Sequence, residues 1–198
     1  MIPTTPAEIT PAIQRLCNRI TRGPEPVYVP VDPVAGATPN SCFSNVTAKI
    51  AEAGGSQILG WTIWATPVMV EAEFHALWRS CAGELIDVSP RPHGESRILF
   101  LPDTSRTYEG RQVNNIREPV FRNDVLVERF IKVNNQIFDV MNRDGRADKH
   151  GMVSVPADEI APLILKKERL GLELMRRRID PAAPCVCGST KKLKNCCG

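Results

Sequence analysis

Three residues of this chain, Cys42, His75 and Asp87, have the types and the order that thiol chemistry on a carbonyl group requires. A cysteine becomes a nucleophile when an imidazole takes up its proton, and the imidazole needs an acceptor that fixes its tautomer. Cys42 opens the stretch CFSNVTAKIAEAGG, His75 lies within EAEFHALW, and Asp87 lies within GELIDVSP. This order predicts a cysteine-dependent acyl-transfer enzyme whose sulfur, base and orienting carboxylate come from three separate elements.

Cys42 is expected at the start of a helix. Within residues 44–52, Val46 and Ile50 lie four residues apart among polar and small residues, and the pair Gly54-Gly55 ends the pattern. Unpaired backbone N–H groups and the helix dipole at such a start favour the thiolate form of a cysteine. The local pattern therefore places Cys42 where a nucleophile is expected.

The residues His75 and Asp87 are expected on strands, because Ile, Val, Trp and Phe alternate with other residues around them. Successive side chains of a strand point to opposite faces, so His75 shares one face with Glu71 and Glu73. The separation of 12 residues between His75 and Asp87 suits neighbouring strands of a hairpin. The antiparallel strands predicted in this way are 56–64, 68–79, 84–89 and a short one at 97–102.

A divalent metal site is a second interpretation of the same strand face. Glu71, Glu73 and His75 could supply three ligands, and His93 or Asp87 could complete the set. Glutamates on the exposed face of a strand are more often solvated than ligating. The Cys–His–Asp interpretation is preferred for that reason.

The stretch from Cys42 to Pro90 resembles the transglutaminase-like branch of the papain-like cysteine enzymes. That family has a cysteine at a helix start, a glycine and a strand after the helix, a His-Ala-Trp-like strand, and a strand with Asp-Pro-Thr or a similar sequence. This chain departs from the pattern at Leu77, which separates Ala76 from Trp78, and in the Val-Ser-Pro that follows Asp87. The matching residues are Cys42, Gly54-Gly55, Gly60, His75-Ala76-Leu77-Trp78 and Asp87-Val88-Ser89-Pro90.

This resemblance implies a papain-like core with an antiparallel sheet. It implies that Cys42 is the nucleophile, His75 the general base and then acid, and Asp87 the residue that orients His75. The backbone N–H of Cys42 would donate to the oxyanion. The implied activity is that of a cysteine-dependent amide hydrolase or acyl transferase that forms a thioester with a protein or peptide substrate, as a peptidase, a deamidase or a transglutaminase-type enzyme.

The end of the chain, PCVCGSTKKLKNCCG, has the composition of a metal site. Four thiolates in a short window suit tetrahedral zinc, and a segment this polar has no other means of holding a shape. We therefore predict one structural Zn²⁺ per chain. Its predicted ligands are Cys185, Cys187, Cys196 and Cys197.

The same tail resembles the SEC-C motif, a zinc-binding module found at the end of the bacterial preprotein-translocation ATPase and of many otherwise unrelated bacterial proteins. Thr190 stands where the family usually has glycine. In the translocation ATPase the module docks a chaperone and lies near ribosome contacts, so the resemblance implies docking to a chaperone or ribosome partner. Besides the four cysteines, the matching residues are Ser189, Lys191, Lys192 and Lys194.

The remaining elements complete an α+β order, because helices follow the strands and do not alternate with them. A first helix is predicted from Pro6 to Ile20, with Thr5 as its cap. Five prolines make residues 23–41 an extended segment, whereas residues 104–121 are predicted to be irregular. Two further helices are predicted at 122–142 and at about 156–178.

The length and composition allow one domain of ordinary size with an appendage. The chain has 198 residues, of which 42% are hydrophobic, and this is enough for a real core. We predict a transglutaminase-like core at 1–121, a helical extension at 122–180 and the zinc motif at 181–198.

Charge is distributed unevenly along the chain. From Ile164 onward nine Lys or Arg accompany three acidic residues, whereas the rest of the chain has 16 Lys or Arg and 19 acidic residues. A basic end indicates contact with an acidic protein surface or RNA, unless it is a solvated helix followed by lysines that balance zinc thiolates. Because the tail lacks aromatic platforms for bases, nucleic acid is the less favoured partner.

The expected location is the cytoplasm, without membrane contact. No apolar run approaches the roughly 18 to 20 residues that cross a bilayer, and the N-terminus lacks a basic segment followed by a hydrophobic one. Four of the seven cysteines have metal-like spacing, which favours a reducing compartment. The contrasting hypothesis is a non-catalytic binding or adaptor protein that its zinc motif recruits to a chaperone or ribosome.

Overall fold

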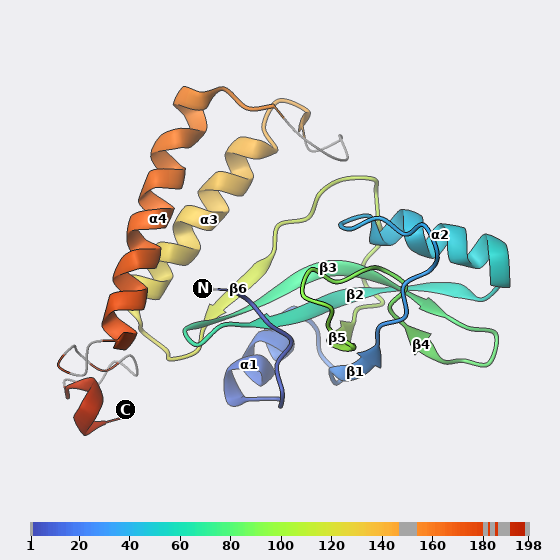
Figure 1. Ribbon diagram of the computed structural model, residues 1–198, viewed down its shortest axis with the longest axis horizontal. Helices are drawn as coiled ribbons and strands as arrows, with labels where there is room; N and C mark the ends of the chain where they lie inside the picture. Colours follow the sequence, from blue (N-terminus) through green and yellow to red (C-terminus); the bar gives the residue numbers. More distant parts are fainter. Residues whose placement is uncertain (1, 147–153, 180–181, 183–184, 186–190, 197–198) are drawn as a thin grey trace. The chain divides into compact units, whose positions relative to one another are not determined.

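The computed structural model describes residues 2–146, 154–179, 182, 185 and 191–196 (Figure 1). The chain divides into two compact units. We call the first the sheet unit, which consists of Thr4–Ala65 and Glu71–Tyr108, and the second the helical unit, which consists of Met1–Pro3, Thr66–Val70 and Glu109–Gly198. The predicted α+β class is confirmed, since an antiparallel sheet precedes a pair of long helices.

The sheet unit holds most of the strands and two helices. Its strands follow the spatial order β1-β5-β2-β3-β4, and Figure 1 shows α1 and α2 on opposite sides of the sheet. The elements are α1 (Pro11–Ile20), β1 (Val27–Pro30), α2 (Cys42–Ala53), β2 (Ser56–Ala65), β3 (Met69–Arg79, of which Glu71 onward belongs to this unit), β4 (Leu85–Ile86) and β5 (Arg97–Pro102).

The position of β5 inside the sheet, between two neighbouring strands, explains why its residues 98–101 are all apolar. This strand pairs with β1 on one side, where Tyr28 is opposite Leu99, and with β2 on the other, where Thr62 is opposite Phe100. Residues 98–101 are therefore fully buried, as a strand covered on both faces requires. The extended proline-rich segment contributes β1 at the sheet edge, where a strand tolerates proline.

The predicted start of the first helix was wrong. Helix α1 begins at Pro11, and the side chain of Thr10 accepts a hydrogen bond from the N–H of Ile13. The sequence offers the same Thr-Pro start signal twice, and the earlier copy is used differently because Thr4 exchanges two backbone hydrogen bonds with Ala65 at the sheet. Tertiary pairing thus selects the second of two local signals.

Two other boundaries also differ from the predictions. The segment 104–121 is not wholly irregular, because it contains β6 (Ile116–Pro119), which pairs with β3. The strand predicted at 84–89 is reduced to the two residues of β4, because Asp87 leaves the β3 ladder and its N–H donates to the carbonyl of Pro30. Short strands without strong alternation carry little signal in the sequence.

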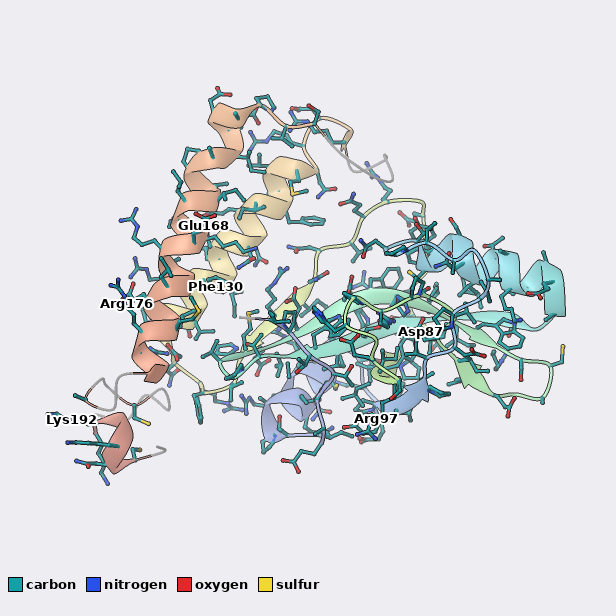
Figure 2. The ribbon with its side chains drawn as sticks, in the orientation of Figure 1. Asp87, Arg97, Phe130, Glu168, Arg176 and Lys192 are labelled. Carbon is teal, nitrogen blue, oxygen red and sulfur yellow. The ribbon has the colours of Figure 1, made fainter. Side chains whose placement is uncertain are left out.

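The helical unit is built on the two long helices α3 (Val125–Met141) and α4 (Ala157–Ile179), close to the predicted bounds. The side chain of Asp124 caps α3 and also receives a hydrogen bond from Arg177 of α4 at 3.0 Å. Figure 2 shows Phe130 on the side of α3 that faces α4. The core cluster of the helical unit consists of Val68, Met69, Val127 and Leu174.

Among the described residues, no helix combines the length and the apolar composition that a membrane span requires.

Candidate active site

The structure brings Cys42, His75 and Asp87 together in the sheet unit. Cys42 is the first residue of α2, His75 lies in the middle of β3, and Asp87 directly follows β4. The Nε2 atom of His75 lies 3.1 Å from Oδ1 of Asp87, and the thiol of Cys42 is close enough to the imidazole to raise its pKa. His75 and Asp87 are buried, whereas Cys42 keeps 9% of its surface exposed.

The strand register explains how His75 reaches Asp87. Trp78 is opposite Ile86 and Arg79 is opposite Leu85, so continuing the register would place Asp87 opposite Leu77. His75 lies two residues further along β3 and therefore meets Asp87 as a diagonal neighbour, within reach of a long side chain. Since Nε2 of His75 faces Asp87, the other ring nitrogen, Nδ1, is left for Cys42.

Arg91 is a member of this cluster that sequence analysis missed. Its Nε donates to Oδ2 of Asp87 at 2.5 Å, its Nη2 makes a shorter contact with the same oxygen, and Nη2 also lies 2.7 Å from Nε2 of His75. The side chain is only 7% exposed. Arg91 lies four residues after Asp87 in the loop that follows Pro90, and no periodic pattern marks a loop arginine as buried.

The charges of the cluster shift the pKa of both titratable partners away from their ordinary values. Burial by itself raises the pKa of Asp87, but the hydrogen bond and charge of His75, and then those of Arg91, lower it by more. Burial by itself lowers the pKa of His75, whereas its contacts with Asp87 and Cys42 raise it, and the net pKa is about 9. The ring is therefore protonated at neutral pH.

Nε2 of His75 faces one hydrogen-bond acceptor and one hydrogen-bond donor. Asp87 can only accept a hydrogen bond, and Arg91 can only donate one. When Nε2 carries a proton, it donates to Asp87, and Arg91 is held by the second oxygen of that carboxylate. When Nε2 is bare, it can accept from Arg91 instead, so the loop arginine can stabilise either protonation state of the histidine.

A second layer of contacts links α2 to the loop that carries Asp87. The side-chain amide of Asn45, one turn after Cys42, donates to the carbonyl of Thr38 at 2.9 Å and to Oγ of Ser89 at 3.1 Å. The backbone N–H of Ser89 in turn donates to Oδ1 of Asp87. The position of Asn45 between Cys42 and Val46, on the apolar side of the predicted helix, was the signal in the sequence that could have identified this link.

The aromatic pair Phe43 and Tyr108 lies beside the sulfur. Their rings stack with centroids 3.5 Å apart and an angle of 2° between the planes. Burial raises the pKa of Tyr108, and the nearby Cys42 raises it further. The partly exposed ring of Tyr108 therefore lies near the sulfur.

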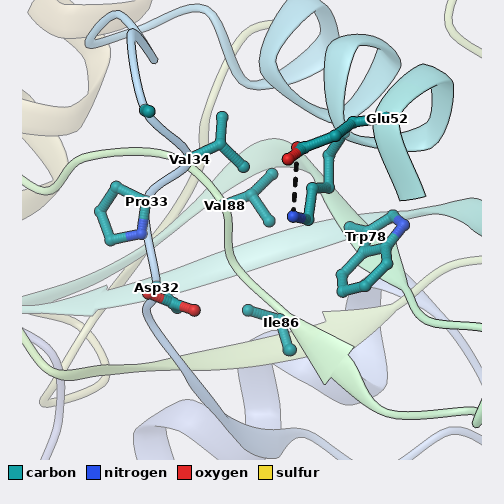
Figure 3. Close-up of a pocket in the computed structure, with 9 residues that line it drawn as sticks. Asp32, Pro33, Val34, Glu52, Trp78, Ile86 and Val88 are labelled. Carbon is teal, nitrogen blue, oxygen red and sulfur yellow. Dashed lines mark hydrogen bonds and ion pairs between the residues drawn. The ribbon is translucent and has the colours of Figure 1, made fainter.

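A cavity of about 220 Å³ lies beside Lys49 and Glu52 in the last turns of α2 (Figure 3). Trp78 and Val88 line it and also belong to the apolar cluster that includes Cys42. Lys49 pairs with Glu52 at 3.2 Å, and its ammonium lies 5.4 Å from the centre of the Trp78 ring. The lining residues are Asp32, Pro33, Val34, Ala35, Lys49, Glu52, Trp78, Ile86 and Val88. Cys42, His75 and Asp87 are not among them, so this cavity is a neighbouring feature and not the reaction site.

The alternative metal site on β3 gains no support. Within the described parts of the chain, no group of three or more His, Cys, Asp or Glu is arranged to hold a metal ion. Glu73 accepts a hydrogen bond from Nε1 of Trp64 at 2.7 Å, and Asp87 is engaged by His75 and Arg91. These carboxylates are therefore occupied by neighbouring donors.

The four predicted zinc ligands are only partly described. Cys187 and Cys197 lie outside the described residues, whereas Cys185 is buried and Cys196 is exposed. The N–H of Cys185 donates to the carbonyl of Lys191 at 2.8 Å, and a short 3₁₀ helix, Leu193–Asn195, leads directly into Cys196. The backbone of Cys185 is thus hydrogen-bonded to that of Lys191. Soft thiolate donors are the ligands that zinc prefers in structural sites.

The fold and site define an α+β protein with a buried Cys–His–Asp cluster at the start of a helix. No family model matches the chain, and no curated protein and no solved structure matches it either. A function is therefore inferred from the geometry of the cluster.

Proposed function

We propose that the sheet unit is a transglutaminase-like cysteine enzyme, which acts as an amide hydrolase or acyl transferase through a thioester. The observation that carries this proposal is the position of His75, whose ring contacts Asp87 through Nε2 and lies near enough to Cys42 for the thiol to raise the pKa of the ring. A buried imidazole between a thiol and a carboxylate is the arrangement that activates a cysteine.

The first step breaks an amide bond of a peptide or carboxamide. The sulfur of Cys42 attacks the carbonyl carbon as a thiolate, and the protonated His75 gives its proton to the leaving amine. The products of this step are a thioester on Cys42 and a free amine or ammonia. The N–H of Cys42, which belongs to the first turn of α2 and has no partner within the helix, donates to the oxyanion.

The second step releases the acyl group. His75, now neutral, takes a proton from water or from an amine as this nucleophile attacks the thioester carbon. Water yields a carboxylic acid and amounts to peptidase or deamidase activity, whereas an amine yields a new amide, as in a transglutaminase. Asp87 keeps the ring oriented, and Arg91 holds Asp87 in place in both steps.

The reactivity of the thiol tests this proposal. At pH 6.5 an ordinary thiol is only about 1% ionised, so iodoacetamide labels it slowly. We expect Cys42 to label at least about tenfold faster than the exposed Cys81, as measured by peptide mass spectrometry. Cys17 is an internal reference, since burial, and then the charge of Glu25, raise its pKa to about 12.

Two further measurements sharpen the test. In the variant His75→Gln the advantage of Cys42 over Cys81 is expected to disappear, because the imidazolium partner is lost. A peptide digest incubated with the enzyme, with and without a fluorescent primary amine, then distinguishes hydrolysis from amine capture by product mass. Labelling of Cys42 no faster than Cys81 at pH 6.5 would exclude the catalytic role.

A non-catalytic adaptor is the second candidate, favoured by the low exposure of Cys42 beside the ring of Tyr108. In this function the sheet unit is a scaffold. The C-terminal motif binds zinc through its four cysteines and docks to a chaperone or ribosome-associated protein. Because an adaptor has no need of an activated thiol, the labelling experiment separates the two functions.

A further inference from the structure

Helix α4 has two different faces. Leu170 and Leu174 are buried, whereas Leu165 and Leu172 are 63% and 53% exposed. Figure 2 shows Arg176 on the side of α4 that points away from α3. Leu165 and Leu172 are seven residues apart, which places them on one stripe about two turns apart. These two leucines give the outward side of α4 apolar surface that the described part of the chain does not cover.

The sequence around this stripe is complementary to itself when two copies of the helix lie antiparallel. The sequence from Leu165 to Leu172 reads Leu-x-x-Glu-Arg-x-x-Leu, with Glu168 and Arg169 at its centre. If a second copy of α4 lies antiparallel across this centre, Leu165 meets Leu172 of the second copy. In the same arrangement, each Glu168 meets an Arg169.

The outer parts of the helix fit the same arrangement. The first turn of α4 is acidic, with Asp158 and Glu159, and the last turns are basic. The antiparallel register brings Asp158 within one turn of Arg176 of the second copy. A parallel pair would instead align like charges, together with helix dipoles that repel each other.

We propose that α4 is a homodimerisation surface, on which a second copy of this chain packs antiparallel with two-fold symmetry. An isologous contact of this kind satisfies both copies with one self-complementary patch. The 23-residue helix is about 35 Å long, so one helix pair makes a small interface. The dimer is therefore expected to form and dissociate with concentration. This proposal is independent of the chemistry of the sheet unit.

Charge exchange across the two-fold axis tests the proposal. The variant Glu168→Arg places two arginines opposite each other at both symmetry-related positions, and Arg169→Glu does the same with two glutamates. We expect each single variant to weaken dimerisation at least tenfold. The double variant Glu168→Arg/Arg169→Glu restores opposite charges and is expected to recover the dimer. The mass of the full chain is measured by sedimentation across concentration, with a reducing agent present to prevent disulfides.

Mixing the two single variants gives a stricter outcome. One chain then carries two arginines and the other two glutamates at the centre, so the mixture is expected to form a heterodimer although each variant alone is monomeric. Formation of this heterodimer also shows that both single variants are folded. A wild-type chain that stays monomeric at every concentration would overturn the proposal, and so would a dimer that both single variants leave unchanged.

Discussion

His75 is the residue on which the chemistry of the sheet unit depends. Its ring is buried, and around it lie one thiol, one carboxylate and one guanidinium, those of Cys42, Asp87 and Arg91. Buried charges are tolerated when each has a partner, and removing one partner of such a cluster is costly because the other is left unpaired. The cluster therefore links protonation of His75 to stability as well as to reactivity.

The pH dependence of stability follows from the pKa of His75. This pKa is raised to about 9 in the folded chain, compared with about 6.5 for an unperturbed histidine. The folded state therefore binds the proton more tightly, and the resulting stabilisation is fully present below pH 6.5 and is lost as the pH rises through 9. We expect the free energy of unfolding to fall by up to about 3 kcal/mol over this window, measured by urea denaturation.

The variant His75→Gln is the control for this measurement. Cys17 contributes its own loss of stability at higher pH, because its raised pKa makes the unfolded thiol ionise first. The comparison is therefore made between pH 6.5 and 8.5, where the variant is expected to show a much flatter profile. If the free energy of unfolding changed equally with pH in the wild type and the variant over this range, His75 would gain no proton affinity on folding.

At the scale of elements, the turn between α2 and β2 fixes the far end of the helix that begins at Cys42. Gly55 has a φ of +87°, and a Cβ atom there would lie 2.2 Å from the carbonyl oxygen of Arg79 and 2.8 Å from Nε1 of Trp78. The same indole donates to the carbonyl of Gly54 at 2.8 Å. The close approach of the turn to β3 therefore requires glycine.

The variant Gly55→Ala should consequently be more destabilising than a glycine substitution in open space. We expect a loss of about 2–4 kcal/mol, because both backbone strain and a steric clash are introduced. Gly83 is the matched control, since its φ is +91° and no atom lies within 4 Å of an added Cβ. Gly83→Ala should cost only about 1 kcal/mol from strain. Similar losses for both variants in urea denaturation would show that the clash at Gly55 is relieved by movement.

At the scale of the whole molecule, the zinc motif is proposed to be a module with its own source of stability. A short polar segment gains its folding free energy from the metal, since structural zinc contributes about 10–16 kcal/mol in small zinc-binding peptides. Within the described residues of this segment, the N–H of Cys185 donates to the carbonyl of Lys191.

Elemental analysis of the full chain, purified without added metal, should therefore find one zinc per chain. Cys185→Ser and Cys196→Ser are each expected to lower the zinc content to well below half, because a thiolate ligand is lost. Cys81→Ser is the matched control and should keep the zinc. A wild-type chain free of zinc would exclude the metal, as would retention of zinc in both ligand variants.

The sequence by itself determined the α+β class, the two long helices and the strand that carries His75, because these depend on periodicity over neighbouring residues. It also indicated Cys42 as the start of a helix, since Gly54-Gly55 bounds that helix at its other end. The start of α1 and the strand β6 were missed, and the strand at 84–89 was predicted too long, because distant backbone pairing overrides weak local signals there.

Only the tertiary structure decided how the candidate site is assembled. The diagonal contact of His75 with Asp87 depends on strand register, and the place of Arg91 depends on the path of a loop. Neither leaves a periodic trace in the sequence. A residue's type and spacing specify its local conformation, whereas the partner that a buried charge meets is set by segments far away along the chain, whose approach is fixed by packing of the whole core.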